Sequence, residues 1–108
     1  MDHKRKDKRF NELKAEIIQA VAHPIRLAII DYLANGEQCV CDIVDYVEAQ
    51  RSNVSRHLNI MLKAGVLSSR KDGLKVIYSL EMYCLTNVLD CIEASLIARI
   101  EKQNRLIK

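Results

Sequence analysis

The stretch Gln50-Arg51-Ser52-Asn53-Val54-Ser55-Arg56-His57-Leu58-Asn59-Ile60-Met61-Leu62-Lys63-Ala64-Gly65 decides the fold. Its apolar residues recur at the i, i+4, i+7, i+8 spacing of a helix with one buried face: Val54, Leu58, Met61 and Leu62. The first two turns of the opposite face carry polar and basic side chains: Arg51, Ser52, Asn53, Ser55, Arg56 and His57. Gly65 can end the helix in a left-handed conformation. Such a helix suits the major groove of DNA, although by itself the segment also fits a solvated surface helix.

A basic hairpin is predicted directly after this helix. Residues 66–70 and 74–79 have the composition of two strands, and Lys71-Asp72-Gly73 joins them; Asp-Gly is a strong signal for a tight hairpin. The basic residues at its tip are Arg70, Lys71 and Lys75. A hairpin of this kind is a wing that can contact phosphates or a minor groove.

Three helices are predicted before the recognition helix. Apolar spacing indicates a helix over 9–21, which His23-Pro24 interrupts, and a second over 24–34 with Pro24 at its first position. A short third helix, residues 40–47, precedes the recognition helix after a tight turn and completes a helix-turn-helix. The predicted fold is therefore mainly α with a small β-hairpin, a winged helix-turn-helix of order α-α-α-α-β-β-α.

The last predicted helix carries a broad apolar stripe. Ser79 is its expected N-cap, and the stripe continues to Ile107. The main members of the stripe are Leu85, Leu89, Ile92, Leu96 and Ile100, and it is widened by Val88 and Ile97. A domain this small has little surface left to cover them, so we expect a homodimer through the first and last helices. Packing against the domain's own core is the alternative.

Length and charge limit the other possibilities. The 108 residues predict one DNA-binding and dimerisation domain over 9–108, preceded by a flexible basic N-terminus over 1–8. The net charge is only +3, but basic residues dominate from Arg51 to Lys75, which is the pattern of a surface that binds a polyanion. No segment predicts a membrane span or a signal peptide, so we expect a cytoplasmic protein without a membrane partner. In that compartment the four cysteines are expected to be free thiols or metal ligands.

Several motifs in fixed order resemble one known family. They are His23-Pro24-Ile25-Arg26-Leu27, Val54-Ser55-Arg56-His57-Leu58, Leu62-Lys63-Ala64-Gly65-Val66-Leu67 and Val76-Ile77-Tyr78-Ser79-Leu80. Over about residues 10–100 the chain resembles the ArsR/SmtB family of small dimeric winged-helix repressors, which sense metals, metalloids or thiol-reactive species. One departure is Gln50-Arg51-Ser52, where the family usually has Ser-Gln-Ser. The change affects the helix cap and the base preference, and the extra arginine is well suited to guanine.

The segment Cys39-Val40-Cys41-Asp42 is the most informative chemical element. It resembles the Cys-Val-Cys-Asp-Leu-Cys run of the family's arsenic sensors, in which three thiolates bind As(III) or Sb(III). Cys39 and Cys41 match the first two ligands, whereas Val44 occupies the third position. A helix N-terminus favours thiolates. Residues i and i+2 lie on different sides of a helix, so both sulfurs reach one ion only if the chain around Cys39 is extended. Closing the site would then distort the helix-turn-helix.

The last helix offers two further candidate ligands, Cys84 and Cys91. They lie about 10 Å apart along a continuous helix, at 1.5 Å per residue, so one chain cannot use both on a single ion. Each can instead meet Cys39 or Cys41, or a partner chain; the alternative is that both are small buried hydrophobes. The family's Asp/His zinc site on the last helix is absent, because every histidine precedes Gly65: His3, His23 and His57. We expect His57 to face DNA or make a local interaction, and His23 to serve the helix junction.

The predicted function is a DNA-binding transcriptional repressor, not an enzyme. Its partners are double-stranded operator DNA and a second copy of the chain, and DNA binding needs no cofactor. Thiolates select thiophilic ions, and a site without histidine favours As(III) or Sb(III) over Cd(II), Pb(II) or Zn(II) as the inducer. The same thiols can alternatively form a disulfide or polysulfide in a redox or persulfide sensor. A thiol-disulfide enzyme would favour Cys-x-x-Cys among alternating strands and helices, and a helical adaptor would not bind DNA at low salt.

Overall fold

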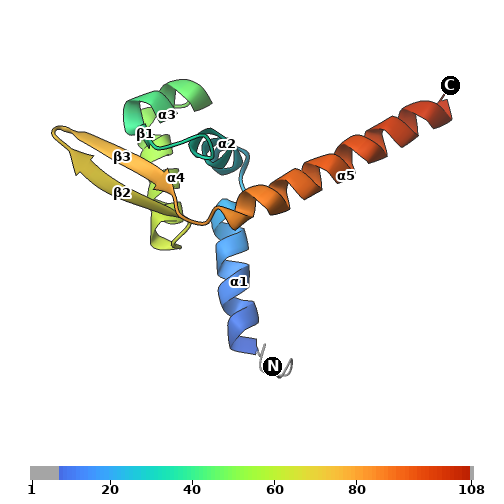
Figure 1. Cartoon of the computed structure of the whole chain (residues 1–108), viewed down its shortest axis with the longest axis horizontal. Coiled ribbons are helices and arrows are strands. Elements are labelled where there is room, and N and C mark those ends of the chain that lie inside the picture. Colours follow the sequence, from blue (N-terminus) through green and yellow to red (C-terminus); the bar gives the residue numbers. More distant parts are fainter. Residues whose placement is uncertain (1–7, 108) are drawn as a thin grey trace.

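The computed structural model describes residues 8–107 and contains five helices and three strands within that range (Figure 1). In chain order they are α1 (Lys8–Val21), α2 (Pro24–Leu33), β1 (Gln38–Cys39), α3 (Val40–Val47), α4 (Arg51–Lys63), β2 (Leu67–Asp72), β3 (Lys75–Leu80) and α5 (Cys84–Ile107). The predicted winged helix-turn-helix class is confirmed. The predicted flexible N-terminus lies outside the described residues apart from Lys8, which already belongs to α1.

The strand β1 was not predicted. It pairs antiparallel with β3, with Gln38 opposite Tyr78 and Cys39 opposite Ile77, so the sheet has the order β1-β3-β2. A strand of two residues is too short to show an alternating pattern in the sequence. This strand bears directly on the site, because Cys39 is paired with the returning strand of the wing.

The start of α2 confirms the expected role of His23. Its backbone is extended, and its Nδ1 accepts a hydrogen bond of 3.1 Å from the Ile25 amide. Pro24 occupies the first turn of the helix, where a missing N–H costs nothing. His23 therefore acts as the N-cap of α2.

The prediction that Ser79 caps the last helix is wrong. Ser79 lies within β3, where it pairs with Ser68, and α5 begins later, at Cys84. The ladder between β2 and β3 continues to the Leu67–Leu80 pair, which keeps the chain extended beyond Ser79. The Ser79 hydroxyl instead donates to the Glu37 carboxylate at 3.4 Å.

The core holds α4 against the other elements of the domain. Val54, Leu58 and Met61 on α4 are fully buried, as the periodicity predicted. They belong to an aliphatic cluster whose other fully buried members are Ile29, Ile30, Leu33, Ile43 and Val66. At the end of α4, Gly65 has a φ of +82°, a conformation that suits glycine and lets the chain turn into the wing.

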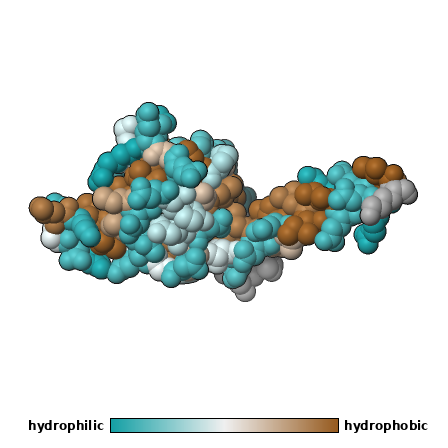
Figure 2. Space-filling model, turned by 90° about the horizontal axis from the view of Figure 1, so that it is seen from above, coloured by the Kyte–Doolittle hydropathy of each residue, from teal (hydrophilic) through white to brown (hydrophobic). Residues whose placement is uncertain are grey.

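The helices α1 and α5 project from this core (Figure 1). The radius of gyration is 16.9 Å, against about 13 Å for a compact domain of this size. Figure 2 shows hydrophobic residues along the projecting α5, and its exposed apolar residues include Val88, Ile92, Leu96, Ile97 and Ile100. Among residues 8–107, no helix has the length and apolar character needed to cross a membrane.

The buried face of α4 should dominate stability. We expect Leu58→Ala to lower the free energy of unfolding by about 2–5 kcal/mol, because it leaves a cavity at a fully buried position. Urea denaturation followed by circular dichroism measures the change. Asn59→Ala, at an exposed position on the same helix, is the control and should shift stability by less than about 0.5 kcal/mol. Equal losses in the two variants would contradict the packing described.

Candidate DNA-binding face and thiol site

The N-terminal half of α4 presents a continuous polar face. Five of the predicted DNA-contacting residues on this helix are exposed: Arg51, Ser52, Asn53, Ser55 and Arg56. They leave Val54 and Leu58 on the opposite side, in the core. Gln50 is the N-cap and makes no side-chain capping bond. The departure from the family's usual first turn thus leaves the helix start without a side-chain cap.

The sequence analysis missed Asn59 on this face. Ser52, Ser55, Arg56 and Asn59 follow the i, i+3, i+4, i+7 spacing of one helical stripe, and all four are exposed. The periodicity that identified the buried stripe also contains this signal. Asn59 therefore extends the polar face by one turn, and an amide side chain can pair with adenine in the major groove.

His57 does not share this exposed face, which corrects its inclusion among the DNA contacts. Only 4% of the residue is accessible. Its Nδ1 accepts a hydrogen bond of 2.9 Å from Arg26 Nε, and its ring lies 4.4 Å from that of His23. Residue 57 follows Val54 by three positions and so turns toward the same interior side of the helix. The local interaction that was the other expectation is the one observed.

Arg26 joins three helices and was not predicted to have this role. Besides His57 on α4, its guanidinium reaches the carbonyl oxygens of Gln19 and Ala20 at 3.5 and 3.3 Å, at the end of α1. Carbonyl oxygens at a helix C-terminus attract a cation, and the Gln19 oxygen also accepts a hydrogen bond of 3.3 Å from the Ala22 amide. Arg26 therefore connects α1 and α2 to the recognition helix.

The charge of His57 bears on this junction. Burial lowers the pKa of His57 below its usual value of 6.5, and the positive charges of His23, Arg26 and Arg56 act in the same direction. A neutral imidazole can accept the Arg26 hydrogen at Nδ1, whereas a protonated ring has only donors. The junction thus requires His57 in its neutral form.

The wing presents Lys71 and Lys75 as exposed cations, whereas Arg70 is engaged within the chain. Arg70 Nη2 lies 2.6 Å from Glu37 Oε1, in a salt bridge to the residue just before β1. Hydrogen bonding from Arg70 is the main cause that lowers the pKa of Glu37. Arg70 was predicted as a DNA contact of the wing tip. To bind a phosphate, its guanidinium has to leave this salt bridge with Glu37.

The two matched cysteines lie at the start of α3. Cys39 is half-buried at the end of β1, and its backbone is extended, with φ −78° and ψ 160°. This is the conformation that the spacing of the two thiols required. Cys41 is exposed in the first turn of α3, and Arg51 Nη1 donates to its sulfur at 3.6 Å. The first residue of the recognition helix therefore contacts one of the two thiols.

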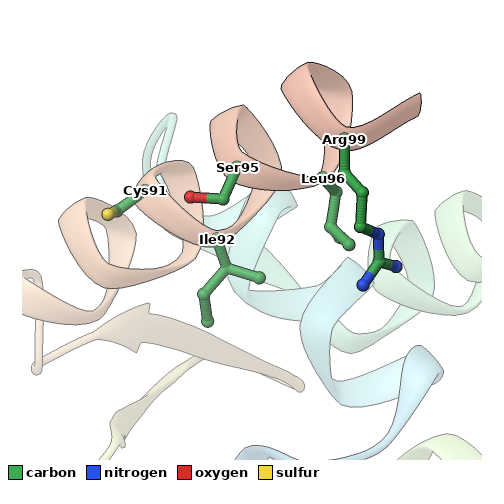
Figure 3. A pocket seen from close by; sticks show the side chains of 5 residues that line it. All are labelled: Cys91, Ile92, Ser95, Leu96 and Arg99. Carbon is green, nitrogen blue, oxygen red and sulfur yellow. The ribbon is translucent and has the colours of Figure 1, made fainter. Parts of the chain in front are cut away.

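Cys84 and Cys91 are free and exposed on α5 in the single chain. Cys91 borders a shallow pocket of about 300 Å³ (Figure 3), whose other lining residues are Ile92, Ser95, Leu96 and Arg99. Within residues 8–107, no three His, Cys, Asp or Glu side chains are grouped so that they can hold a metal ion. The last helix therefore does not supply a third ligand to Cys39 and Cys41 within the described part of one chain.

Comparisons with known proteins agree with this geometry. The family described as "Bacterial regulatory protein, arsR family" matches residues 23–69. The uncharacterized HTH-type transcriptional regulator MJ1325 of Methanocaldococcus jannaschii is 46% identical over 63 residues, covering 57% of this chain and 71% of the relative. An arsenical resistance operon repressor of Staphylococcus xylosus is 30% identical over 82 residues, covering 73% of this chain and 79% of the relative.

A solved structure extends the similarity to the fold of almost the whole chain. The homodimeric winged helix-turn-helix DNA-binding domain of Mb0332 from Mycobacterium bovis matches with a TM-score of 0.77 at 22% identity, covering 94% of this chain and 93% of that one. The chain belongs to the ArsR/SmtB family of winged helix-turn-helix transcriptional regulators. The predictions of a transcriptional repressor of this family and of a protein that is not an enzyme are confirmed.

The junction at His57 predicts a specific pH dependence of stability. Because the pKa of His57 is lowered in the folded state, the unfolded chain binds the proton more readily once the pH falls toward 6.5. The free energy of unfolding contributed by this residue is therefore complete above pH 6.5 and falls as the pH drops below it. Urea denaturation at about pH 8 and about pH 5.5 measures the difference.

Two variants separate this contribution from others. We expect His57→Asn to flatten the pH dependence, since its Oδ1 can replace Nδ1 as the acceptor for Arg26 without titrating. His23→Asn keeps a good N-cap and should retain most of the dependence. A His57→Asn protein with the same pH dependence as the wild type would show that this histidine is not the titrating group.

Proposed function

We propose that the protein is a dimeric repressor that leaves its operator when a thiophilic ion, As(III) or Sb(III) in particular, binds Cys39 and Cys41. The DNA contacts are the exposed residues of α4 and the cations of the wing: Arg51, Ser52, Asn53, Ser55, Arg56, Asn59, Arg70, Lys71 and Lys75. The arsenical resistance repressor among the relatives supports a metalloid inducer. Soft thiolate ligands without histidine favour the same ions.

The contact between Arg51 and Cys41 carries this proposal. At 3.6 Å, the guanidinium of a DNA-facing residue and the sulfur of a candidate ligand cannot both keep this arrangement once an ion occupies the thiol. Binding of the ion withdraws the sulfur from Arg51 and changes the position of the first turn of α4. A hundredfold loss of DNA affinity requires a coupling free energy of about 2.8 kcal/mol, at 1.4 kcal/mol per tenfold.

The wing offers a second connection to the same thiols. Cys39 pairs with Ile77 in β3, and the nearby Glu37 holds Arg70 of β2. Movement of the backbone around Cys39 therefore acts on both strands of the wing. One binding event at the start of α3 can in this way disturb the recognition helix and the wing together.

The third ligand must come from outside the arrangement seen in one chain, given that no group of three ligands forms within residues 8–107. Cys84 or Cys91 of a second copy, or a small thiol from solution, are the candidates. Both α5 cysteines are exposed, which leaves them accessible to a partner chain.

The same observation supports a second candidate function. Two accessible thiols without a third ligand suit disulfide or polysulfide chemistry. In this alternative an oxidant or persulfide replaces the ion as the inducer, and the contact from Cys41 to Arg51 transmits the change in the same way. Treatment with arsenite under reducing conditions distinguishes the two mechanisms.

The apolar face of α5 supports a homodimer. Ile92, Leu96 and Ile100 are between 42% and 53% exposed and lie on one side of the helix. On α1, Phe10, Leu13 and Ile18 are exposed as well. Pairing these surfaces across a two-fold axis removes them from water and places two recognition helices on one palindromic operator.

The thiol mechanism makes a prediction for each cysteine. The test uses a duplex selected from a random pool by the wild-type protein. Arsenite should release the reduced wild-type protein from this duplex, and the released fraction of Cys41→Ser or Cys39→Ser should be at least tenfold smaller. Gel shift measures release, and ultraviolet absorption measures thiolate coordination. Cys84→Ser and Cys91→Ser show whether α5 supplies a ligand.

The outcomes distinguish binding of arsenite at the thiols from the effect of that binding on DNA affinity. Arg51→Gln should keep the arsenite absorption but show a smaller ratio of DNA affinities without and with arsenite, because the link to the thiol is lost. If Cys41→Ser is released at the same arsenite concentration as the wild type, the Cys39/Cys41 site is wrong. Release by polysulfide but not by arsenite would favour the second function.

A charged residue placed at the centre of the proposed dimer surface tests that surface. We expect Leu96→Glu to convert the dimer to a monomer at micromolar concentration and to weaken operator binding by at least tenfold, because a carboxylate is costly to bury. Sedimentation velocity measures the mass. Asn87→Glu adds the same charge to the opposite, exposed side of α5 and should leave the dimer intact. A dimeric Leu96→Glu protein would place the interface elsewhere.

A further inference from the structure

The tip of the wing carries an aliphatic side chain without any packing role. Leu74 has a relative exposure of 105%, above that of every other exposed large hydrophobic residue in residues 8–107. It lies in the two-residue loop Gly73-Leu74, between the paired residues Asp72 and Lys75. Figure 2 shows a hydrophobic patch at the end of the molecule opposite α5, where the wing ends. A leucine in this position does not stabilise the fold.

The hairpin holds Leu74 in a defined place. Every residue of β2 from Leu67 to Asp72 is paired with a residue of β3. Gly73 has a φ of +64° and takes the first position of the loop, where hairpin turns of type II′ require glycine. Since the loop is short and its strands are fully paired, little conformational freedom is lost when the tip contacts a partner.

The surroundings of Leu74 favour DNA as that partner. Lys71 and Lys75 are exposed on either side of the tip, and Asp72 is the single acidic residue within the hairpin. An apolar side chain between two cations suits a surface that combines phosphates with apolar sugars. A hydrophobic protein partner would not need the flanking cations.

The dimensions of the wing agree with a groove next to the one that α4 reads. The base of the wing follows α4 directly and packs beside it. Strands of six residues span about 20 Å at about 3.3 Å per residue, which exceeds half of the roughly 34 Å repeat of B-DNA. With α4 in the major groove, the tip of the hairpin reaches the adjacent minor groove.

We propose that Leu74 enters the minor groove beside each half-site and packs against deoxyribose and the edges of A·T pairs. This inference rests on the DNA-binding face proposed above. The minor groove is about 6 Å wide, and a G·C pair there adds the guanine N2 amino group to the floor. Leucine is among the side chains that proteins insert into this groove. Leu74 thus selects A·T pairs at positions that no polar side chain contacts.

The first experiment compares apolar and charged contacts on a duplex selected from a random pool by the wild-type dimer. Leu74→Ser should weaken binding about tenfold and leave the dependence of affinity on salt unchanged, because no charge is lost. Leu74→Met keeps an apolar side chain and should bind within about twofold of the wild type. Lys75→Ala should lower the salt slope by about 0.9 per protomer. Both residues are exposed, so folding is not at risk.

The second experiment identifies the groove. Each A·T pair flanking the α4 half-site is replaced by G·C or by inosine·cytosine, which resembles G·C in the major groove but lacks the guanine amino group in the minor groove. At the pair that Leu74 contacts, the wild type should lose affinity with G·C and keep it with inosine·cytosine. Leu74→Ser should not discriminate between the two duplexes.

The outcomes separate this inference from the proposed DNA-binding face. If Lys75→Ala lowers the salt slope while Leu74→Ser binds as tightly as the wild type, the role of Leu74 is overturned and the wing contact stands. If neither variant changes binding, the wing does not contact DNA and both proposals fail there. Equal losses with G·C and inosine·cytosine would place Leu74 outside the minor groove.

Discussion

Burial of one side of α4 is the constraint on which the rest of the structure depends. Val54, Leu58 and Met61 are withdrawn from water, and this burial orients the helix so that its arginines, serines and asparagines point outward. Arg26 and His57 secure the same orientation by a polar contact at the edge of the core. Because Arg26 also binds the end of α1, the recognition helix is tied to a helix of the expected dimer interface.

The short strand β1 gives the thiol segment its position. Pairing with β3 keeps Cys39 extended, and the next residue begins α3. Three contacts then leave the segment: Cys41 to Arg51, Glu37 to Arg70, and the β1–β3 ladder. A chemical event at the thiols therefore lies beside both parts of the protein that face DNA.

The family of the protein and its proposed sensing chemistry are supported by different observations. Similarity to the arsR-family model covers residues 23–69, which include the helix-turn-helix. The proposed inducer site rests on Cys39 and Cys41, and within residues 8–107 of one chain no group of three possible metal ligands forms. Val44 in place of a third cysteine makes this protein differ from the arsenic sensors that it resembles.

The sequence by itself determined the order of the helices, the wing, the buried stripe of α4 and the candidate thiols. The helices and the wing follow from local patterns: helical periodicity, Pro24 at a helix start, and Gly73 at the hairpin, whose two-residue loop is Gly73-Leu74 and not the predicted Lys71-Asp72-Gly73. The candidate thiols followed from the resemblance to a family motif. The tertiary structure decided that His57 is buried, that Arg70 binds Glu37 and that Cys39 belongs to a strand. Each of these depends on a partner more than thirty residues away in the chain. Periodicity describes one helix or strand at a time, so contacts between distant elements appear only when the chain has folded.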